Sequence, residues 1–132
     1  MEDITVTFPG NKKVRASYRG NIIDSDQRKE HGGDGSAPPP FDLFLASIAN
    51  CSATYIVYFC QKRDIPLDNI RFIQKMDRND ETRMIEKIRL IVELPEDFPE
   101  KYRQPLLKTI DLCTVKKHIV DPPEFELSTV TV

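Results

Sequence analysis

The stretch Phe41–Arg63, FDLFLASIANCSATYIVYFCQKR, decides how this chain of 132 residues folds. Its apolar side chains recur at helical spacing, at Phe44, Ile48, Cys51, Tyr55 and Tyr58. Pro40 suits the first turn of a helix, because its missing N–H is not needed there, and Asp42 complements the positive end of the helix dipole. The spacing predicts one long central helix with a cysteine near its middle.

This helix is apolar enough to raise the question of a membrane. Several polar residues argue against a lipid environment, among them Asp42, Asn50, Ser52 and Thr54. A helix that is apolar on most sides must be covered by other protein, and a small protein has little chain to spare for this. We therefore expect a buried central helix, part of whose cover a second subunit supplies.

Composition excludes some functions. Charged residues make up 30% of the chain and nearly cancel, leaving a formal net charge of -2, so no basic surface for nucleic acid is expected. The start of the chain, MEDITVTF, alternates apolar and polar residues and lacks the apolar run of a signal peptide. These features predict a cytoplasmic protein that binds neither nucleic acid nor a membrane.

On both sides of the helix, apolar and polar residues alternate along the chain, which is the pattern of β-strands. On its N-terminal side, residues 4–8 and 14–18 alternate around a turn at Pro9–Asn11, which predicts a hairpin, and a second turn at residues 19–21 leads to Ile22 and Ile23. A polar loop, residues 24–36, follows.

On the C-terminal side, residues 70–76 and 83–94 predict a second hairpin, and residues 100–112 predict a helix with Pro105 at an awkward interior position. Asp111 is expected to cap a further short helix that contains Cys113, and the tail 124–132 is expected to close the fold as a strand. The order of elements predicts one α+β domain over residues 1–132 with largely antiparallel sheets.

The cysteines are the candidates for chemistry. Their odd number, the lack of a CxxC motif and the wide separation of the two histidines argue against a disulfide framework and against a metal site. Ile48 and Tyr55 are helical neighbours of Cys51 and form an apolar wall beside it. Lys116 and Lys117 follow Cys113 by about one helical turn, where a cation favours thiolate.

Plain packing is the alternative for all three cysteines, because free cysteine is among the most buried residue types. Cys60 lies about half a revolution around the helix from Cys51, so these two are not expected to share a site. We interpret Cys60 and His31 as structural or merely exposed. Spacing alone leaves a functional Cys51–Cys113 pair and simple packing both open.

Two runs of sequence resemble a known family. The run Gly32–Leu43, GGDGSAPPPFDL, followed by Ala49-Asn50-Cys51, resembles the glycine-rich loop, proline and cysteine-bearing helix of the OsmC/Ohr family of peroxide-handling proteins. The run Leu112–Lys117, LCTVKK, resembles the segment that carries the second cysteine of that family. The resemblance implies an intertwined homodimer of α+β subunits.

The resemblance also implies a thiol-dependent peroxidase. Cys51 would reduce a small organic hydroperoxide and become a sulfenic acid, and Cys113 would condense with it to a disulfide. A dithiol or lipoyl-type reductant would restore both thiols, and no cofactor or metal would be needed. Apolar residues of the helix, Phe41, Phe44, Ile48 and Tyr55, would line the substrate pocket.

The chain departs from the peroxidases of that family at two places. They carry a glutamate ten residues before the reactive cysteine, where this chain has Phe41, and an arginine on an early strand. Asp42, Arg15 and Arg19 are the nearest groups that could stabilise a thiolate instead. The alternative function is a non-catalytic dimer of the same fold that binds a small apolar ligand or a partner, with the cysteines as packing.

Overall fold

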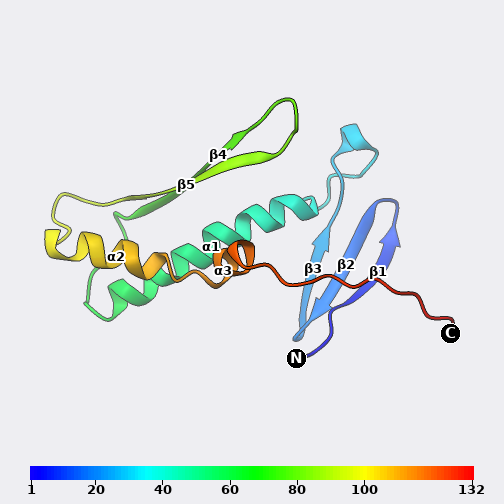
Figure 1. The fold of residues 1–132 in the computed structure, drawn as a ribbon, viewed down its shortest axis with the longest axis horizontal. Coiled ribbons are helices and arrows are strands. Elements are labelled where there is room, and N and C mark those ends of the chain that lie inside the picture. The colour runs from blue at the N-terminus through cyan, green and yellow to red at the C-terminus, as the bar shows by residue number, and fades with distance from the viewer. The chain divides into compact units, whose positions relative to one another are not determined.

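In a computed structural model that describes residues 1–132, the chain forms two compact units, Met1–Ala46 and Ser47–Val132. The boundary falls inside the long helix α1 (Pro40–Gln61), which has nearly the limits predicted from the sequence. Figure 1 shows the order of elements: three strands, α1, a strand hairpin, and then short helices. This is the predicted α+β class with antiparallel sheets. That the whole chain is one domain stays a prediction.

The first unit is built on a three-stranded antiparallel sheet. Strands β1 (Thr5–Gly10), β2 (Lys13–Tyr18) and β3 (Asn21–Ser25) lie in chain order, with Val6 opposite Ala16 and Ala16 opposite Ile23. The turn between β2 and β3 needs Gly20, whose φ of 74° is a conformation that other residues seldom adopt. Both turns stand where the sequence predicts them.

Asp26 organises the polar loop after β3. Its side chain is almost fully buried, and its carboxylate accepts hydrogen bonds from the backbone N–H of Gln27, at 2.7 Å, and from the N–H and the hydroxyl of Ser36, at 3.0 and 2.7 Å. A short 3₁₀ helix, η1 (Lys29–His31), lies between them. Gly33 packs so closely on the loop that an added Cβ would lie 2.0 Å from the carbonyl oxygen of Gln27. The loop is thus compact and internally bonded.

The second unit contains most of α1 and everything after it. Strands β4 (Arg71–Arg78) and β5 (Ile85–Glu93) form an antiparallel hairpin, followed by η2 (Glu100–Tyr102), α2 (Arg103–Ile110) and α3 (Thr114–Val120). In β5 the half-buried residues Ile88, Leu90 and Val92 alternate with exposed ones, as the period-two pattern predicts, except that Ile91 is apolar and exposed.

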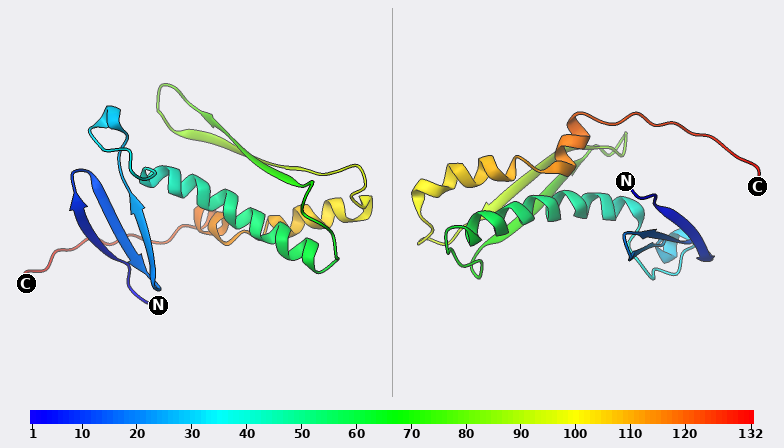
Figure 2. Two further views of the ribbon diagram at one scale, coloured as in Figure 1. Left: turned by 180° about the vertical axis from the view of Figure 1, so that it is seen from behind. Right: turned by 90° about the horizontal axis from the view of Figure 1, so that it is seen from below.

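The hydrophobic core of this unit joins α1 to α2. Figures 1 and 2 show α2 beside the C-terminal end of α1, with the β4–β5 hairpin next to both. The buried cluster consists of Ile56, Phe59, Cys60, Phe98, Leu106 and Ile110. The rings of Phe59 and Tyr102 meet edge to face, 5.8 Å apart, and the Arg63 guanidinium lies 3.6 Å from the centre of the Phe59 ring.

Two predicted elements differ in the structure. The helix expected over residues 100–112 is a 3₁₀ turn followed by α2, which places Pro105 in the first helical turn, where its missing N–H costs nothing. The tail 124–132 is fully extended but forms no strand, so that prediction is wrong for the single chain. An isolated strand has no partner for its backbone groups, and within one chain no strand pairs with the tail.

Much of α1 is left uncovered by its own chain. By length and composition the helix could cross a membrane, a test that the core helix of a soluble protein also passes, and only 28% of its most apolar window is buried. Phe41, Phe44 and Tyr58 are 49%, 42% and 57% exposed. The protein therefore presents a large apolar helical surface that a second chain could cover.

Candidate functional site

Helix α1 carries the first half of the site, on consecutive residues. Cys51 lies in the fourth turn and is half-buried, while the next residue, Ser52, has no exposed surface at all. A hydroxyl in the middle of a helix commonly bonds to the carbonyl four residues before it, as Thr54 does with Asn50 at 2.9 Å. Ser52 makes no such bond, so its hydroxyl remains available to other elements.

Cys113 forms the second half of the site at the start of α3. It is fully buried and is itself the N-cap residue: its Sγ accepts a hydrogen bond from the backbone N–H of Lys116 at 3.4 Å. The prediction that Asp111 caps this helix is wrong. The Asp111 carboxylate instead forms an ion pair with the Lys116 ammonium group.

The structure brings Cys51 and Cys113 together. The Cys51 side chain is near enough to act on the Cys113 thiol and lower its pKa, and both thiols are free. Burial is the largest influence on Cys113 and raises its pKa, but the hydrogen bond from the Lys116 N–H and the nearby Cys51 and Ser52 side chains together outweigh it. The pKa of Cys113 therefore lies below that of an ordinary cysteine, which favours thiolate.

Cys60 has a different environment on the same helix. It is fully buried in the hydrophobic core, and this burial raises the pKa of its thiol against a smaller opposing effect of Arg63. A buried neutral thiol is chemically inert. This separate environment agrees with the prediction that Cys60 and Cys51, about half a revolution apart around the helix, do not share a site.

An apolar hollow reaches α1 at Ile48, and neither Cys51 nor Cys113 lines it. It has a volume of about 320 Å³ and is lined by Ile48, Ile88, Leu90, Lys116 and Ile119. Ile48 precedes Cys51 by about one helical turn, and Lys116 follows Cys113 at the start of α3. Tyr55, the other expected wall residue, packs instead against the core cluster.

The remaining predicted site residues belong to the first unit. Phe41 and Phe44 stack in the first turns of α1, with ring centres 5.6 Å apart, and the Asp42 carboxylate lies 3.8 Å from the Arg28 guanidinium. The Arg19 guanidinium lies 4.9 Å from the centre of the Tyr18 ring.

Arg15 is held by a carboxylate on the neighbouring strand. Its Nε and Nη2 donate to the two carboxylate oxygens of Asp24 at 2.7 and 3.0 Å. The hydrogen bond from Arg15 lowers the pKa of Asp24 to about 2 and raises the pKa of Arg15. Arg15 thus already has an anionic partner.

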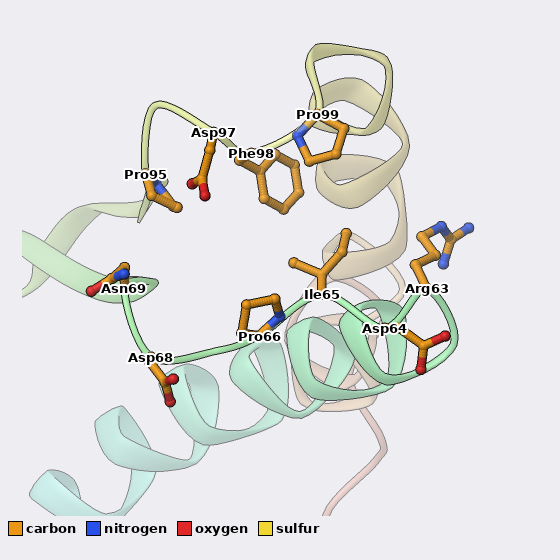
Figure 3. Close-up of a pocket in the computed structure, with 10 residues that line it drawn as sticks. All are labelled: Arg63, Asp64, Ile65, Pro66, Asp68, Asn69, Pro95, Asp97, Phe98 and Pro99. Atoms are coloured by element: carbon orange, nitrogen blue, oxygen red, sulfur yellow. The ribbon is translucent and has the colours of Figure 1, made fainter.

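Another hollow lies at the opposite end of the second unit (Figure 3). Its volume is about 340 Å³, and the loops that follow α1 and β5 line it, with Arg63, Asp64, Asp68, Asp97 and Phe98 among the residues. No cysteine and no predicted site residue takes part.

Three buried polar residues, Ser25, Asp26 and Ser52, were not assigned by sequence reasoning. The signal for Ser52 was visible, because a small polar residue beside Cys51 is unusual in an apolar stretch. Nothing in the pattern of the polar loop distinguished Asp26 from the acidic residues around it.

Comparisons with known proteins agree with this geometry. The family model of OsmC-like proteins matches residues 33–128. A solved structure from Psychrobacter arcticus 273-4, described in terms of osmotic stress induction and a detoxification response, has 22% sequence identity and a TM-score of 0.70, over 89% of this chain and 87% of that one.

A second solved structure is an organic hydroperoxide resistance protein OsmC from Legionella pneumophila. It has 20% identity and a TM-score of 0.53, over 89% of this chain and 87% of that one. At these identities both structures show a shared fold. No sequence among curated proteins matches the chain.

Proposed function

The chain belongs to the family of OsmC-like proteins, and from this premise we propose that it is a thiol-dependent peroxidase that reduces organic hydroperoxides. The observation that carries the proposal is the contact between Cys51 and Cys113. Two free thiols from distant parts of a chain that lie close together have the arrangement that a cysteine peroxidase needs, and neighbours of both along the chain, Ile48 and Lys116, line an apolar hollow.

The reaction balances with these two residues and an external dithiol. The Cys51 thiolate attacks the O–O bond of the hydroperoxide, so that one oxygen stays on sulfur as a sulfenic acid and the other leaves as an alcohol. The Cys113 thiolate then attacks the Cys51 sulfur, which forms the disulfide and releases hydroxide that is protonated to water. A dithiol or lipoyl-type reductant exchanges with the disulfide, restores both thiols and becomes oxidised itself.

The half-buried Cys51 suits the first step and the buried Cys113 the second. A substrate must reach the attacking sulfur, and only Cys51 of the two has exposed surface. The hollow beside Ile48 would take the alkyl or aryl group of an organic hydroperoxide, whereas hydrogen peroxide gains nothing from apolar walls.

We also propose that the protein works as a homodimer. The support is the uncovered apolar surface of α1, together with the tail residues Phe125, Leu127 and Val130, which are 88%, 97% and 84% exposed. Exposed apolar surface of this extent marks an interaction site, and a second copy of the chain offers the same surface in return.

A peroxide-consumption assay tests the proposed activity. Cumene hydroperoxide is supplied with dithiothreitol, and wild type is compared with Cys51→Ser and with the matched control Cys60→Ala on the same helix. We expect wild type and Cys60→Ala to consume the hydroperoxide, faster than they consume hydrogen peroxide, and Cys51→Ser to fall to background. Equal rates in wild type and Cys51→Ser, or no rate above background in wild type, would sink the proposal.

A further inference from the structure

The hydroxyl of Ser52 is an unexplained feature of the second unit. It lies on α1 with no exposed surface and without any hydrogen-bond partner of ordinary distance and angle. Buried hydroxyls are almost always paired, so an unpaired one calls for a reason at that position. Helix propensity does not explain a serine at this position, because alanine and leucine form helices more readily than serine.

The group nearest in chemistry to the Ser52 hydroxyl is the Cys113 sulfur. Both side chains are fully buried, and Ser52 lies close enough to this sulfur to be one of the groups that lower the pKa of Cys113. The sulfur also accepts the N–H of Lys116 at 3.4 Å. The nearby charged groups, the Lys116 ammonium and the Asp111 carboxylate, are paired with each other. Neutral donors are therefore what stabilises charge on Cys113.

We propose that Ser52 is a positioning residue, which donates a hydrogen bond to the Cys113 sulfur and holds it as the nucleophile that resolves the Cys51 sulfenic acid. The resolving role of Cys113 rests on the proposed peroxidase function, whereas the hydrogen bond from Ser52 does not. In the resolving step the Cys113 sulfur forms a bond to the Cys51 sulfur, the S–O bond breaks, and the oxygen leaves as hydroxide. A hydrogen bond from the Ser52 hydroxyl stabilises the Cys113 thiolate before this step. Once the Cys113 sulfur is part of a disulfide it carries no charge, so the hydroxyl no longer has an anionic acceptor.

The first test needs no peroxide. In the full chain with Cys51→Ala and Cys60→Ala, Cys113 is the sole thiol, and its ionisation is followed by the ultraviolet absorbance of the thiolate. We expect Ser52→Ala to raise the pKa of Cys113 by about one pH unit, the size of one lost hydrogen bond to a charged group. Thr54→Ala, which removes an exposed hydroxyl from the same helix, should leave the titration unchanged.

Ser52→Thr guards against a trivial loss of structure, because it keeps the hydroxyl while changing the shape of the side chain. We expect it to retain the low pKa of Cys113, and thermal unfolding shows that each variant is folded. A titration that is the same in Ser52→Ala as in the parent, or one in which Ser52→Thr behaves like Ser52→Ala, would overturn the proposal.

The second test follows the resolving step in a chain with all three cysteines. After one equivalent of cumene hydroperoxide, the sulfenic acid is trapped with a 1,3-diketone and the disulfide is quantified by mass spectrometry. We expect Ser52→Ala to form sulfenic acid at the wild-type rate but disulfide up to about tenfold more slowly at neutral pH. Unchanged disulfide formation contradicts the role of Ser52. A wild-type chain that forms no sulfenic acid contradicts the peroxidase instead, and leaves the titration as the test of Ser52.

Discussion

At the scale of single residues, three cysteines in one small protein have three different environments. Cys51 is half-buried and open to a substrate, Cys113 is buried among hydrogen-bond donors, and Cys60 is buried among apolar side chains. Burial among apolar side chains raises the pKa of Cys60, whereas the groups around Cys113 lower the pKa of that thiol. The environments therefore separate Cys60 from the proposed pair.

The ion pair between Arg15 and Asp24 gives a prediction for acid stability. The folded-state pKa of Asp24 is about 2, below its unfolded value near 3.9, so the unfolded chain binds more protons between these values. The contribution of Asp24 to stability is fully present above about pH 4 and is lost as the pH falls toward 2.

We therefore expect wild type to resist urea better than Asp24→Asn at pH 6, with a difference that shrinks steadily below pH 4. The matched control is Asp3→Asn, which replaces an exposed aspartate. Urea unfolding at several pH values measures the difference, and a difference that does not change with pH would contradict the assignment.

Individual residues were the hardest part of the site to predict from sequence. Cys51 and Cys113 stood out by type and spacing, but their contact depends on the packing of the segments that carry them, which no local pattern encodes. The cap of α3 was misassigned to Asp111, because aspartate is a common cap and cysteine a rare one. The structural partner of Arg15 was missed, because Asp24 lies on the next strand and only register brings it opposite.

At the scale of elements, Cys113 has a structural role as well as a proposed chemical one, because it is the N-cap residue of α3. Its sulfur caps α3, so the same atom that is proposed to attack Cys51 also satisfies a backbone N–H at the start of a seven-residue helix. Short helices depend strongly on their caps and on packing.

Replacing this cap should have a measurable cost. We expect Cys113→Ala to lower the free energy of unfolding by about 1 kcal/mol relative to Cys113→Ser, because the serine hydroxyl can accept the same N–H. Both variants lack the thiol, so the comparison isolates the cap. Urea unfolding at neutral pH measures it, and equal stabilities of the two variants would show that the sulfur does not act as a cap.

Element boundaries followed the sequence well where a pattern repeats. Both hairpins and α1 came from periodicity, which depends only on local alternation. The tail 124–132 has the alternation of a strand and yet forms none, since a strand needs a neighbour that the single chain does not place beside it. The alternation of apolar and polar residues therefore indicated that the segment can form a strand, but not which strand it would pair with.

At the scale of the whole molecule, α1 and the tail both expose large apolar side chains. We expect the chain to sediment with twice the mass of one protomer at micromolar concentration. Truncation after Pro123, which removes the exposed apolar side chains of the tail, should shift the equilibrium toward monomer.

Analytical ultracentrifugation of the full chain and of the truncated chain measures both expectations. A charge substitution in the same tail that leaves its apolar residues in place, Glu126→Gln, is the control and should not weaken the dimer. A full-length chain that sediments as a monomer would contradict the homodimer, and a dimer equally stable without the tail would place the interface elsewhere.

The central claim is that Cys51 and Cys113 act as one redox pair. The most direct measurement is the mass of the intact protein, followed by peptide mapping, after treatment with one equivalent of cumene hydroperoxide without reductant. We predict a loss of two hydrogens per chain, a cross-link between the peptides of Cys51 and Cys113, and its reversal by a dithiol. A cross-link through Cys60, or stable oxidation of Cys51 with Cys113 left as a free thiol, would contradict it.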